Sequence, residues 1–183
     1  MLIGQSDESG NQLYENILGR QAEYVSMLPF MQVLDDFDPT DIIIFPGRYG
    51  NAGILSNLSN YEGKIHIDMN YDCDDILDLD TIKIQTVFLS TSSTSFEEFF
   101  KEISYDNLIK YFDKKNVSQL LIKENRGGSW LYDFKEKTSY EAPAHIGEII
   151  HSVGVGDVYD IAFMSEMVGT NIAGNMAFAA WMS

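Results

Sequence analysis

Residues Ile149–Asp157 read IIHSVGVGD, and a largely apolar segment, 158–167, follows directly. The glycines at Gly154 and Gly156 allow a tight turn and let a ligand approach the backbone closely. A helix that begins after such a turn leaves its first N–H groups without partners, and the helix dipole adds positive potential there. The segment therefore predicts an anion site at a helix start. Asp157 places a carboxylate beside that anion, which favours a base that takes a proton from a hydroxyl attacking phosphorus.

The wider segment His151–Phe163 resembles the C-terminal signature of the ribokinase (PfkB) family of carbohydrate kinases. That signature reads Asp-Thr-x-Gly-Ala-Gly-Asp and continues into a helix of small and apolar residues. The Gly-x-Gly-Asp core is kept here, whereas Ser152 replaces the threonine, His151 the first aspartate and Ala162 a usual glycine. A Gly-x-Gly-Asp alone also fits a strand-to-helix turn capped by Asp157. The order and spacing of the other motifs therefore carry the resemblance.

The composition is that of a globular, strongly acidic chain. Its 183 residues suffice for one domain with a real core and are few for two, so we predict a single domain over residues 1–183. Lysines and arginines number 12 against 28 acids, a net charge of −16, which argues against nucleic acid and anionic membranes as partners. No apolar run reaches bilayer-spanning length. The single cysteine, Cys73, excludes an internal disulfide and suits a reducing cytoplasm.

Short apolar runs bounded by turn residues alternate with helical patterns along the chain. Such runs are typical of strands buried on both faces of a sheet, and the alternation indicates a mostly parallel α/β sheet flanked by helices. We expect a helix over 96–112, a hairpin strand over Ser129–Phe134, a short helix over Leu13–Leu18 and a closing helix over Val168–Ser183. The runs expected to form parallel strands are Asp41–Phe45, Lys64–Asp68, Thr86–Ser90 and Gln119–Lys123.

The residues after each strand are candidates for ligand contact, because ligands bind parallel α/β sheets at the carboxyl ends of the strands. The segment 68–71 resembles the family's Asp-x-Asn-x-Arg strand end, which implies that Asp68 and Asn70 lie near the substrate. The arginine position of that motif holds Asp72. The segment 88–98 takes the place of the family's Asn-x-x-Glu, which positions magnesium and phosphate. The resemblance implies that Glu97 or Glu98 is an outer-shell magnesium ligand, although Thr94 or Ser95 replaces the asparagine.

A third strand-end motif concerns the nucleotide. Residues 122–131 resemble the family's Thr-Leu-Gly-x-x-Gly segment, which lies along the nucleotide. Gly128 matches the second glycine, and Asn125 stands in place of the first. Asparagine tolerates a positive φ better than most residues, so the turn is expected to form. The resemblance implies nucleotide contacts for Lys123, Asn125, Gly128 and Ser152.

The resemblance covers Asp41–Ser183 and implies a three-layer ribokinase-like fold without the family's N-terminal part and most of its lid. It implies transfer of the γ-phosphoryl group of ATP to a hydroxyl of a sugar or nucleoside-type substrate, with ATP and Mg²⁺ as cofactors. Asp157 would accept the hydroxyl proton, and the backbone at Gly154, Val155 and Gly156 would hold the growing charge. We expect a cytoplasmic protein without nucleic-acid or membrane partners, and a homodimer is compatible with the sequence.

Two other functions stay open. His151, Asp72 and the replaced asparagine favour a degenerate family member that binds nucleotide or sugar without transferring phosphate. The acidic surface favours an assembly or regulatory module. Calcium binding by an EF-hand is excluded, because Cys73 and Leu79 stand where the loop that starts at Asp68 needs glycine and glutamate. No phosphate-loop or dinucleotide-binding glycine signature occurs.

Overall fold

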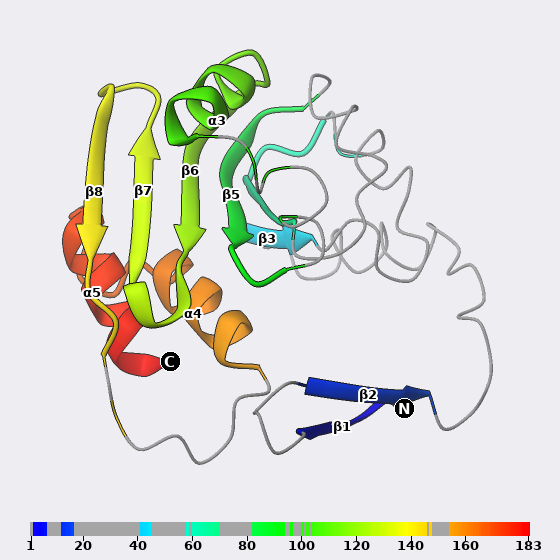
Figure 1. Ribbon diagram of the computed structural model, residues 1–183. Helices are drawn as coiled ribbons and strands as arrows, with labels where there is room; N and C mark the ends of the chain where they lie inside the picture. Colours follow the sequence, from blue (N-terminus) through cyan, green and yellow to red (C-terminus); the bar gives the residue numbers. More distant parts are fainter. Residues whose placement is uncertain are drawn as a thin grey trace.

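A computed structural model shows a large sheet covered by helices and, apart from it, a small two-stranded sheet (Figure 1). The structure describes residues 2–6, 12–16, 41–44, 58, 60–69, 82–93, 96, 100, 102, 104–145, 147 and 154–183. The large sheet and its helices are formed between Asp41 and Met182 and contain most of the motifs discussed above.

The large sheet has six strands in the order β3-β4-β5-β6-β7-β8. The first four run parallel, and β7 and β8 are antiparallel additions. β4, β5 and β6 are buried along most of their length on both faces, which is why their sequences are nearly continuous apolar runs. The predicted α/β fold, its four parallel strands and the hairpin are confirmed. The strands are β3 (Asp41–Ile44), β4 (Lys64–Asp68), β5 (Ile84–Ser90), β6 (Val117–Lys123), β7 (Ser129–Asp133) and β8 (Thr138–Ala142).

β8 forms one edge of the sheet, and the sequence analysis does not predict it. Its sequence, TSYEA, is largely polar, and three of its five residues are exposed. An edge strand has a neighbour on one side only and needs no continuous apolar run. Pairing with β7 therefore determines this strand, in a register that places Tyr140 opposite Leu131.

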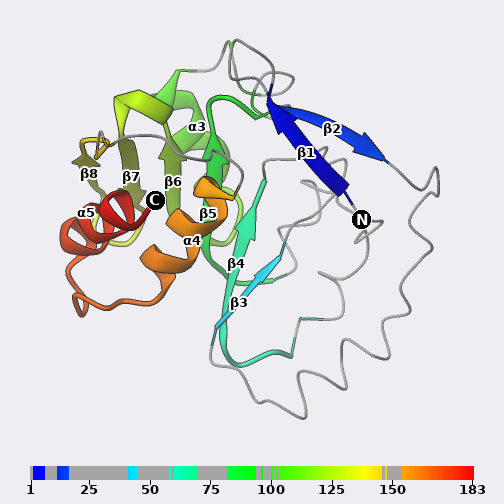
Figure 2. The same ribbon diagram turned by 90° about the horizontal axis from the view of Figure 1, so that it is seen from below.

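Within the described residues, three α-helices cover the two faces of the large sheet. α3 (Tyr105–Phe112) packs on one face, and α4 (Val155–Met164) and α5 (Ile172–Met182) pack together on the other, as Figure 2 shows. On the α3 side, Leu108 and Phe112 lie in a core of branched aliphatic and aromatic residues. On the α4 side, Phe163 packs edge-to-face on Phe88 with ring centroids 5.9 Å apart. The predicted three-layer arrangement is thus present, and no helix in the described part of the chain is long enough to cross a membrane.

Two predicted helices differ in extent from the sequence pattern. The helix expected over 96–112 is not one continuous helix, because Ser104 has an extended backbone and α3 begins at Tyr105. Before this break Phe96 and Phe100 are also in helical conformation, and residues 97–99, 101 and 103 lie outside the described part of the chain. The helix expected over Val168–Ser183 begins only at Ile172. There the Asn171 side chain accepts a hydrogen bond from the N–H of Gly174 and caps the first turn. In both cases a capping residue type stands inside a segment whose apolar pattern is continuous.

The small sheet consists of β1 (Leu2–Ser6) and β2 (Gln12–Asn16), which pair antiparallel with Leu2 opposite Asn16. The short helix predicted over Leu13–Leu18 is therefore wrong. The polar turn sequence between the two strands is a hairpin signal, and it outweighs the helical spacing of a few apolar residues.

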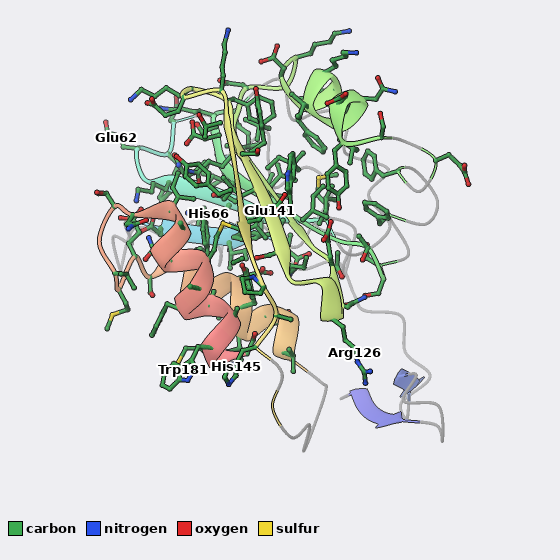
Figure 3. The ribbon with its side chains drawn as sticks, turned by 60° about the vertical axis from the view of Figure 1, so that its left-hand side comes forward. Glu62, His66, Arg126, Glu141, His145 and Trp181 are labelled. Carbon is green, nitrogen blue, oxygen red and sulfur yellow. The ribbon has the colours of Figure 1, made fainter. Side chains whose placement is uncertain are left out.

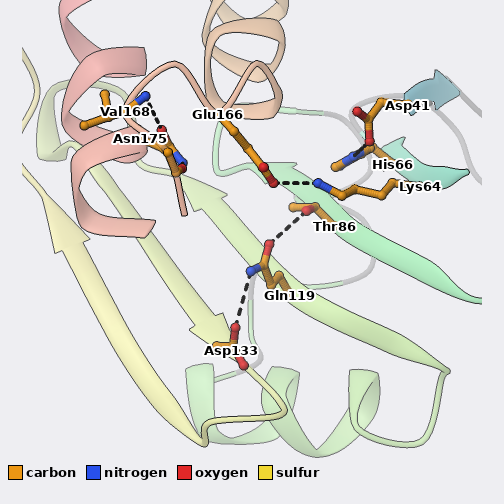
Figure 4. Close-up of polar contacts among 10 residues, drawn as sticks. Asp41, Lys64, His66, Thr86, Gln119, Asp133, Glu166, Val168 and Asn175 are labelled. Atoms are coloured by element: carbon orange, nitrogen blue, oxygen red, sulfur yellow. Dashed lines mark hydrogen bonds and ion pairs between the residues drawn. The ribbon is translucent and has the colours of Figure 1, made fainter. Parts of the chain in front are cut away.

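A row of polar side chains crosses the sheet beneath α4 and the turn after it (Figure 4). Thr86 Oγ1 donates to Gln119 Oε1 at 3.1 Å, and Gln119 Nε2 donates to Asp133 Oδ2 at 3.3 Å. His66 lies next in the row, 4% exposed, with Nε2 3.6 Å from Asp41 Oδ1. His66, Thr86 and Gln119 line a cavity of about 140 Å³. Burial lowers the pKa of His66 to about 4, and the nearby Asp41 raises it only in part.

His66 predicts a loss of stability in mild acid. In the unfolded chain the ring takes up a proton at its ordinary pKa of 6.5, whereas in the folded chain it does so only near 4. The contribution of His66 to the free energy of unfolding is therefore fully present above pH 6.5. It falls by up to about 3 kcal/mol as the pH drops toward 4. Urea unfolding of wild type and His66→Gln across this range measures the effect, and His145→Gln, at an exposed histidine, is the control. An equal pH slope in wild type and His66→Gln would contradict it.

Candidate active site

The start of α4 presents backbone N–H groups at the carboxyl end of the parallel strands. Gly154 precedes the helix with a left-handed φ of 84°, and a Cβ there would meet nothing within 4 Å. The N–H of Val158 donates to the Gly154 carbonyl at 2.9 Å. This is the first hydrogen bond within the helix, so it leaves out the N–H groups of Val155, Gly156 and Asp157. Gly154, at the N-cap position, has no side chain to cap them. A helix start of this kind offers hydrogen-bond donors and positive potential to an anion.

Two aspartates of α4 lie one turn apart in opposite environments. Asp157, in the first turn, is exposed, whereas Asp160 is 0% exposed and faces the sheet. Asp157 is exposed, so its carboxylate is accessible to a ligand, and it stands beside N–H groups that have no partner among the described residues. Asp160 is not among the residues that the sequence analysis singles out.

Asp160 belongs to a buried charge triad with Lys123 and Asp68. The ammonium of Lys123 donates to Asp160 Oδ1 at 2.7 Å and Oδ2 at 2.8 Å, and Asp68 Oδ2 lies 3.5 Å away. Lys123 is the last residue of β6 and Asp68 the last residue of β4, so the triad joins two strand ends to the helix. All three side chains are at least nine-tenths buried.

The triad leaves one buried ammonium to neutralise two carboxyl groups. Burial lowers the pKa of Lys123, but the charges of Asp160 and Asp68 outweigh it and raise that pKa above its ordinary value, so the lysine stays charged. Burial also raises the pKa of the Asp160 carboxyl well above its ordinary range. Lys123 lowers the Asp160 pKa and Asp68 raises it. The Asp160 carboxyl therefore holds on to a proton more strongly than an isolated aspartate does.

A second polar contact fastens α4 to the antiparallel part of the sheet. The Tyr159 hydroxyl and the Ser129 hydroxyl lie 2.6 Å apart in a buried hydrogen bond. Burial raises the pKa of Tyr159 to about 12, against the lowering effect of this bond. Tyr159 and Asp160 are consecutive residues, so their two contacts fix the rotation of α4 about its own axis.

The turn between β6 and β7 has the geometry expected of it. Asn125 adopts a φ of 54° and starts a short 3₁₀ helix, η3 (Asn125–Gly127). Gly128 has a φ of 100°, and a Cβ there would lie 2.2 Å from the Ala142 carbonyl oxygen. Only glycine fits this position. Figure 3 shows Arg126 projecting from this turn away from the sheet, where it is an exposed cation.

The fold gathers most of the sequence-predicted site residues at one edge of the sheet. Gly154, Val155, Gly156 and Asp157 form the start of α4, and Asp68 and Lys123 meet below it. Asn125 and Gly128 lie in the turn that directly follows Lys123, where the Ser92 hydroxyl donates to Asn125 Oδ1 at 3.4 Å. The predicted residues that lie outside the described part of the chain are Asn70, Glu97, Glu98 and Ser152.

The described carboxylates at this edge do not form a magnesium site. Asp68 and Asp160 are occupied by Lys123, and no group of three or more acidic, histidine or cysteine side chains is placed to hold a metal within the described residues. The predicted magnesium ligands, Glu97 and Glu98, are outside those residues.

Solved structures share this architecture. The chain matches the ribokinase of Thermotoga maritima with a TM-score of 0.74 and 14% identity, over 98% of this chain and 60% of that one. The chain has a ribokinase-like fold. This confirms the fold predicted from the resemblance. No protein-family model and no curated protein matches the chain.

Two further ribokinase-like structures were solved with small molecules bound. An Arabidopsis thaliana ribokinase in complex with ribose and ATP matches with a TM-score of 0.70 and 15% identity, over 98% of this chain and 60% of that one. A Burkholderia thailandensis nucleoside kinase in complex with inosine matches with a TM-score of 0.67 and 14% identity, over 99% of this chain and 58% of that one. The chain thus spans about 60% of the length of these ribokinase-like structures.

The turn geometry predicts a strong stability effect at Gly128. The change Gly128→Ala should lower the free energy of unfolding by about 2–4 kcal/mol, because the new methyl group meets the Ala142 carbonyl in a backbone conformation that only glycine adopts readily. Chemical denaturation measures this loss. The control is Gly147→Ala, where a Cβ meets nothing within 4 Å. If Gly128→Ala lowers the free energy of unfolding no more than Gly147→Ala does, the close approach of Gly128 to the Ala142 carbonyl is refuted.

Proposed function

We propose that this protein is an ATP-dependent phosphotransferase that moves the γ-phosphoryl group to a hydroxyl of a sugar or nucleoside-type substrate. The observation that carries the proposal is the start of α4, where unpaired N–H groups and the exposed Asp157 lie together at the strand ends of a ribokinase-like fold. The ribose, ATP and inosine in the two ligand-bound structures support the substrate class. The single cysteine and the proposed use of ATP favour a cytoplasmic location.

In the proposed reaction Asp157 takes the proton of the acceptor hydroxyl. The hydroxyl oxygen forms a bond to the γ-phosphorus as the bond to the ADP oxygen breaks, and ADP leaves with the electron pair. The N–H groups of Val155, Gly156 and Asp157 stabilise the charge on the transferred group. A carboxylate beside an anion opposes its binding, and this cost is justified where the carboxylate accepts a proton in the reaction.

The other predicted residues have proposed roles around this centre. Lys123, Asn125, Gly128 and Ser152 are assigned to the nucleotide side, and Asp68 and Asn70 to the substrate side. Magnesium, which neutralises phosphate charge when bound, is assigned to Glu97 or Glu98 in its outer shell.

A substrate panel tests the proposed function. The full chain is incubated with Mg-ATP and, separately, ribose, other sugars and nucleosides, and ADP release is followed. We expect ADP formation that depends on one acceptor. The absence of ADP with every acceptor, together with no thermal shift by Mg-ATP, would contradict the proposal and favour an assembly module.

A nucleotide- or sugar-binding protein without transfer is the second candidate. His151 replaces the first aspartate of the family signature and Asp72 replaces an arginine, which favours this alternative. A thermal shift with Mg-ATP in the absence of ADP release with any acceptor would support it.

Asp157 gives the sharpest test of the mechanism. The change Asp157→Asn should lower turnover by about 10²–10⁴-fold, because the amide cannot accept the hydroxyl proton, while the affinity for Mg-ATP changes by less than about threefold. Steady-state kinetics and calorimetry measure the two quantities. The matched control is Asp106→Asn, which changes an exposed aspartate in the first turn of α3 on the other face of the sheet. Turnover within a few-fold of wild type would refute Asp157 as the base.

A further inference from the structure

The ammonium of Lys123 lies directly beneath the first turn of α4. A Cβ built on Gly156 would stand 3.5 Å from Lys123 Nζ. The same nitrogen lies over the Phe88 ring, 5.7 Å from its centre. Lys123 thus places a buried positive charge under the backbone that carries the free N–H groups.

The two carboxyl groups of the triad hold that charge in place. Lys123 Nζ lies 2.7 and 2.8 Å from the two Asp160 oxygens and 3.5 Å from Asp68 Oδ2. A lysine held in this way has little freedom to swing toward a ligand. Its influence on a ligand is therefore indirect, through the electric field and through the position of α4.

We propose that Lys123 is a positioning residue for phosphoryl binding, which holds the first turn of α4 over the end of β6 and neutralises buried carboxyl charge that would otherwise repel an anion bound at Gly154–Asp157. This inference rests on the proposed function. It differs from the motif-based assignment, in which Lys123 contacts the nucleotide directly.

Burial makes the field of this lysine effective. A charge in the protein interior is screened less than one in water, so the ammonium acts over a longer distance than a surface lysine. The buried carboxyl groups of Asp160 and Asp68 lie beside the same nitrogen, and Lys123 offsets their charge. The exposed Asp157 opposes an incoming anion, and without Lys123 the charges of Asp160 and Asp68 would add to that repulsion.

A ligand comparison separates this role from a purely structural one. The full-length chain is titrated with Mg-ATP and with adenosine, and the ratio of the two dissociation constants is measured. In Lys123→Met we expect the preference for Mg-ATP to fall about tenfold, because one positive charge near the phosphates is lost, while adenosine affinity stays within about threefold. A lysine that only maintains the fold would weaken both ligands together.

Two further variants keep the outcome clear. Lys114→Met removes an exposed lysine from the turn before β6 and should leave both affinities unchanged. Lys123→Met combined with Asp160→Asn removes one of the two carboxylates that the single change leaves without a cation. This double variant is used if the single variant does not fold. It leaves the net charge of the triad unchanged, and a loss of preference is still expected because Lys123 no longer holds the first turn of α4.

The results also separate this inference from the proposed function. A folded Lys123 variant that keeps the wild-type preference for Mg-ATP, while wild type binds and transfers phosphate, overturns the inference alone. A Lys123 variant whose affinities for Mg-ATP and adenosine fall by the same factor also overturns the inference alone. Wild-type protein that binds neither Mg-ATP nor adenosine overturns the proposed function and this inference with it.

Discussion

The ion pair between Lys123 and Asp160 joins the helix layer to the end of the sheet, and the geometry of the candidate site depends on it. Burying charged groups costs several kcal/mol for each ion, and the cost is offset only when the partners are close and hydrogen-bonded. The two bonds of 2.7 and 2.8 Å meet that condition. An apolar contact would hold α4 against the sheet as well, but it would specify neither its rotation nor its position along the strands as narrowly.

This constraint acts together with the bond between Ser129 and Tyr159. Tyr159 is held by β7 and Asp160 by the end of β6, so two neighbouring residues of α4 are anchored to two neighbouring strands. Packing of Phe163 on Phe88 fixes the helix one turn further on. The first turn of α4 is consequently carried to the carboxyl edge of the sheet, where its N–H groups face outward. The anion-binding character of this turn is local, whereas its placement is a property of the fold.

The sequence predicts the layered fold because the fold depends on patterns that are local. The four parallel strands are short apolar runs between breakers, and the turn at Asn125 and Gly128 follows from residues that tolerate positive φ. The edge strand β8 escapes prediction because a strand with one neighbour needs little apolar surface. The late starts of α3 and α5 escape it because Ser104 and Asn171 end an apolar pattern that is otherwise continuous.

The buried triad shows why the site is only partly predictable. Lys123 and Asp160 are separated by 37 positions and Lys123 and Asp68 by 55, so only the parallel order of β4, β5 and β6 brings them together. The sequence does indicate that Asp160 has a polar partner. It is an aspartate inside a largely apolar helix, and a buried aspartate is usually paired with a charged or hydrogen-bonding group. Its partner could not be named without the fold.

The separation of Asp157 and Asp160 by one helical turn explains how one helix start can combine two opposed requirements. A proposed base needs an exposed carboxylate at the anion site, and the anion site needs positive potential. Two exposed aspartates on the same turn would repel the ligand twice. The fold instead buries the second aspartate against Lys123, where it serves to hold a cation beneath the first. The helix therefore presents Asp157 at the surface and Asp160 to Lys123 in the interior, and the N–H groups of its first turn lie at the same helix start.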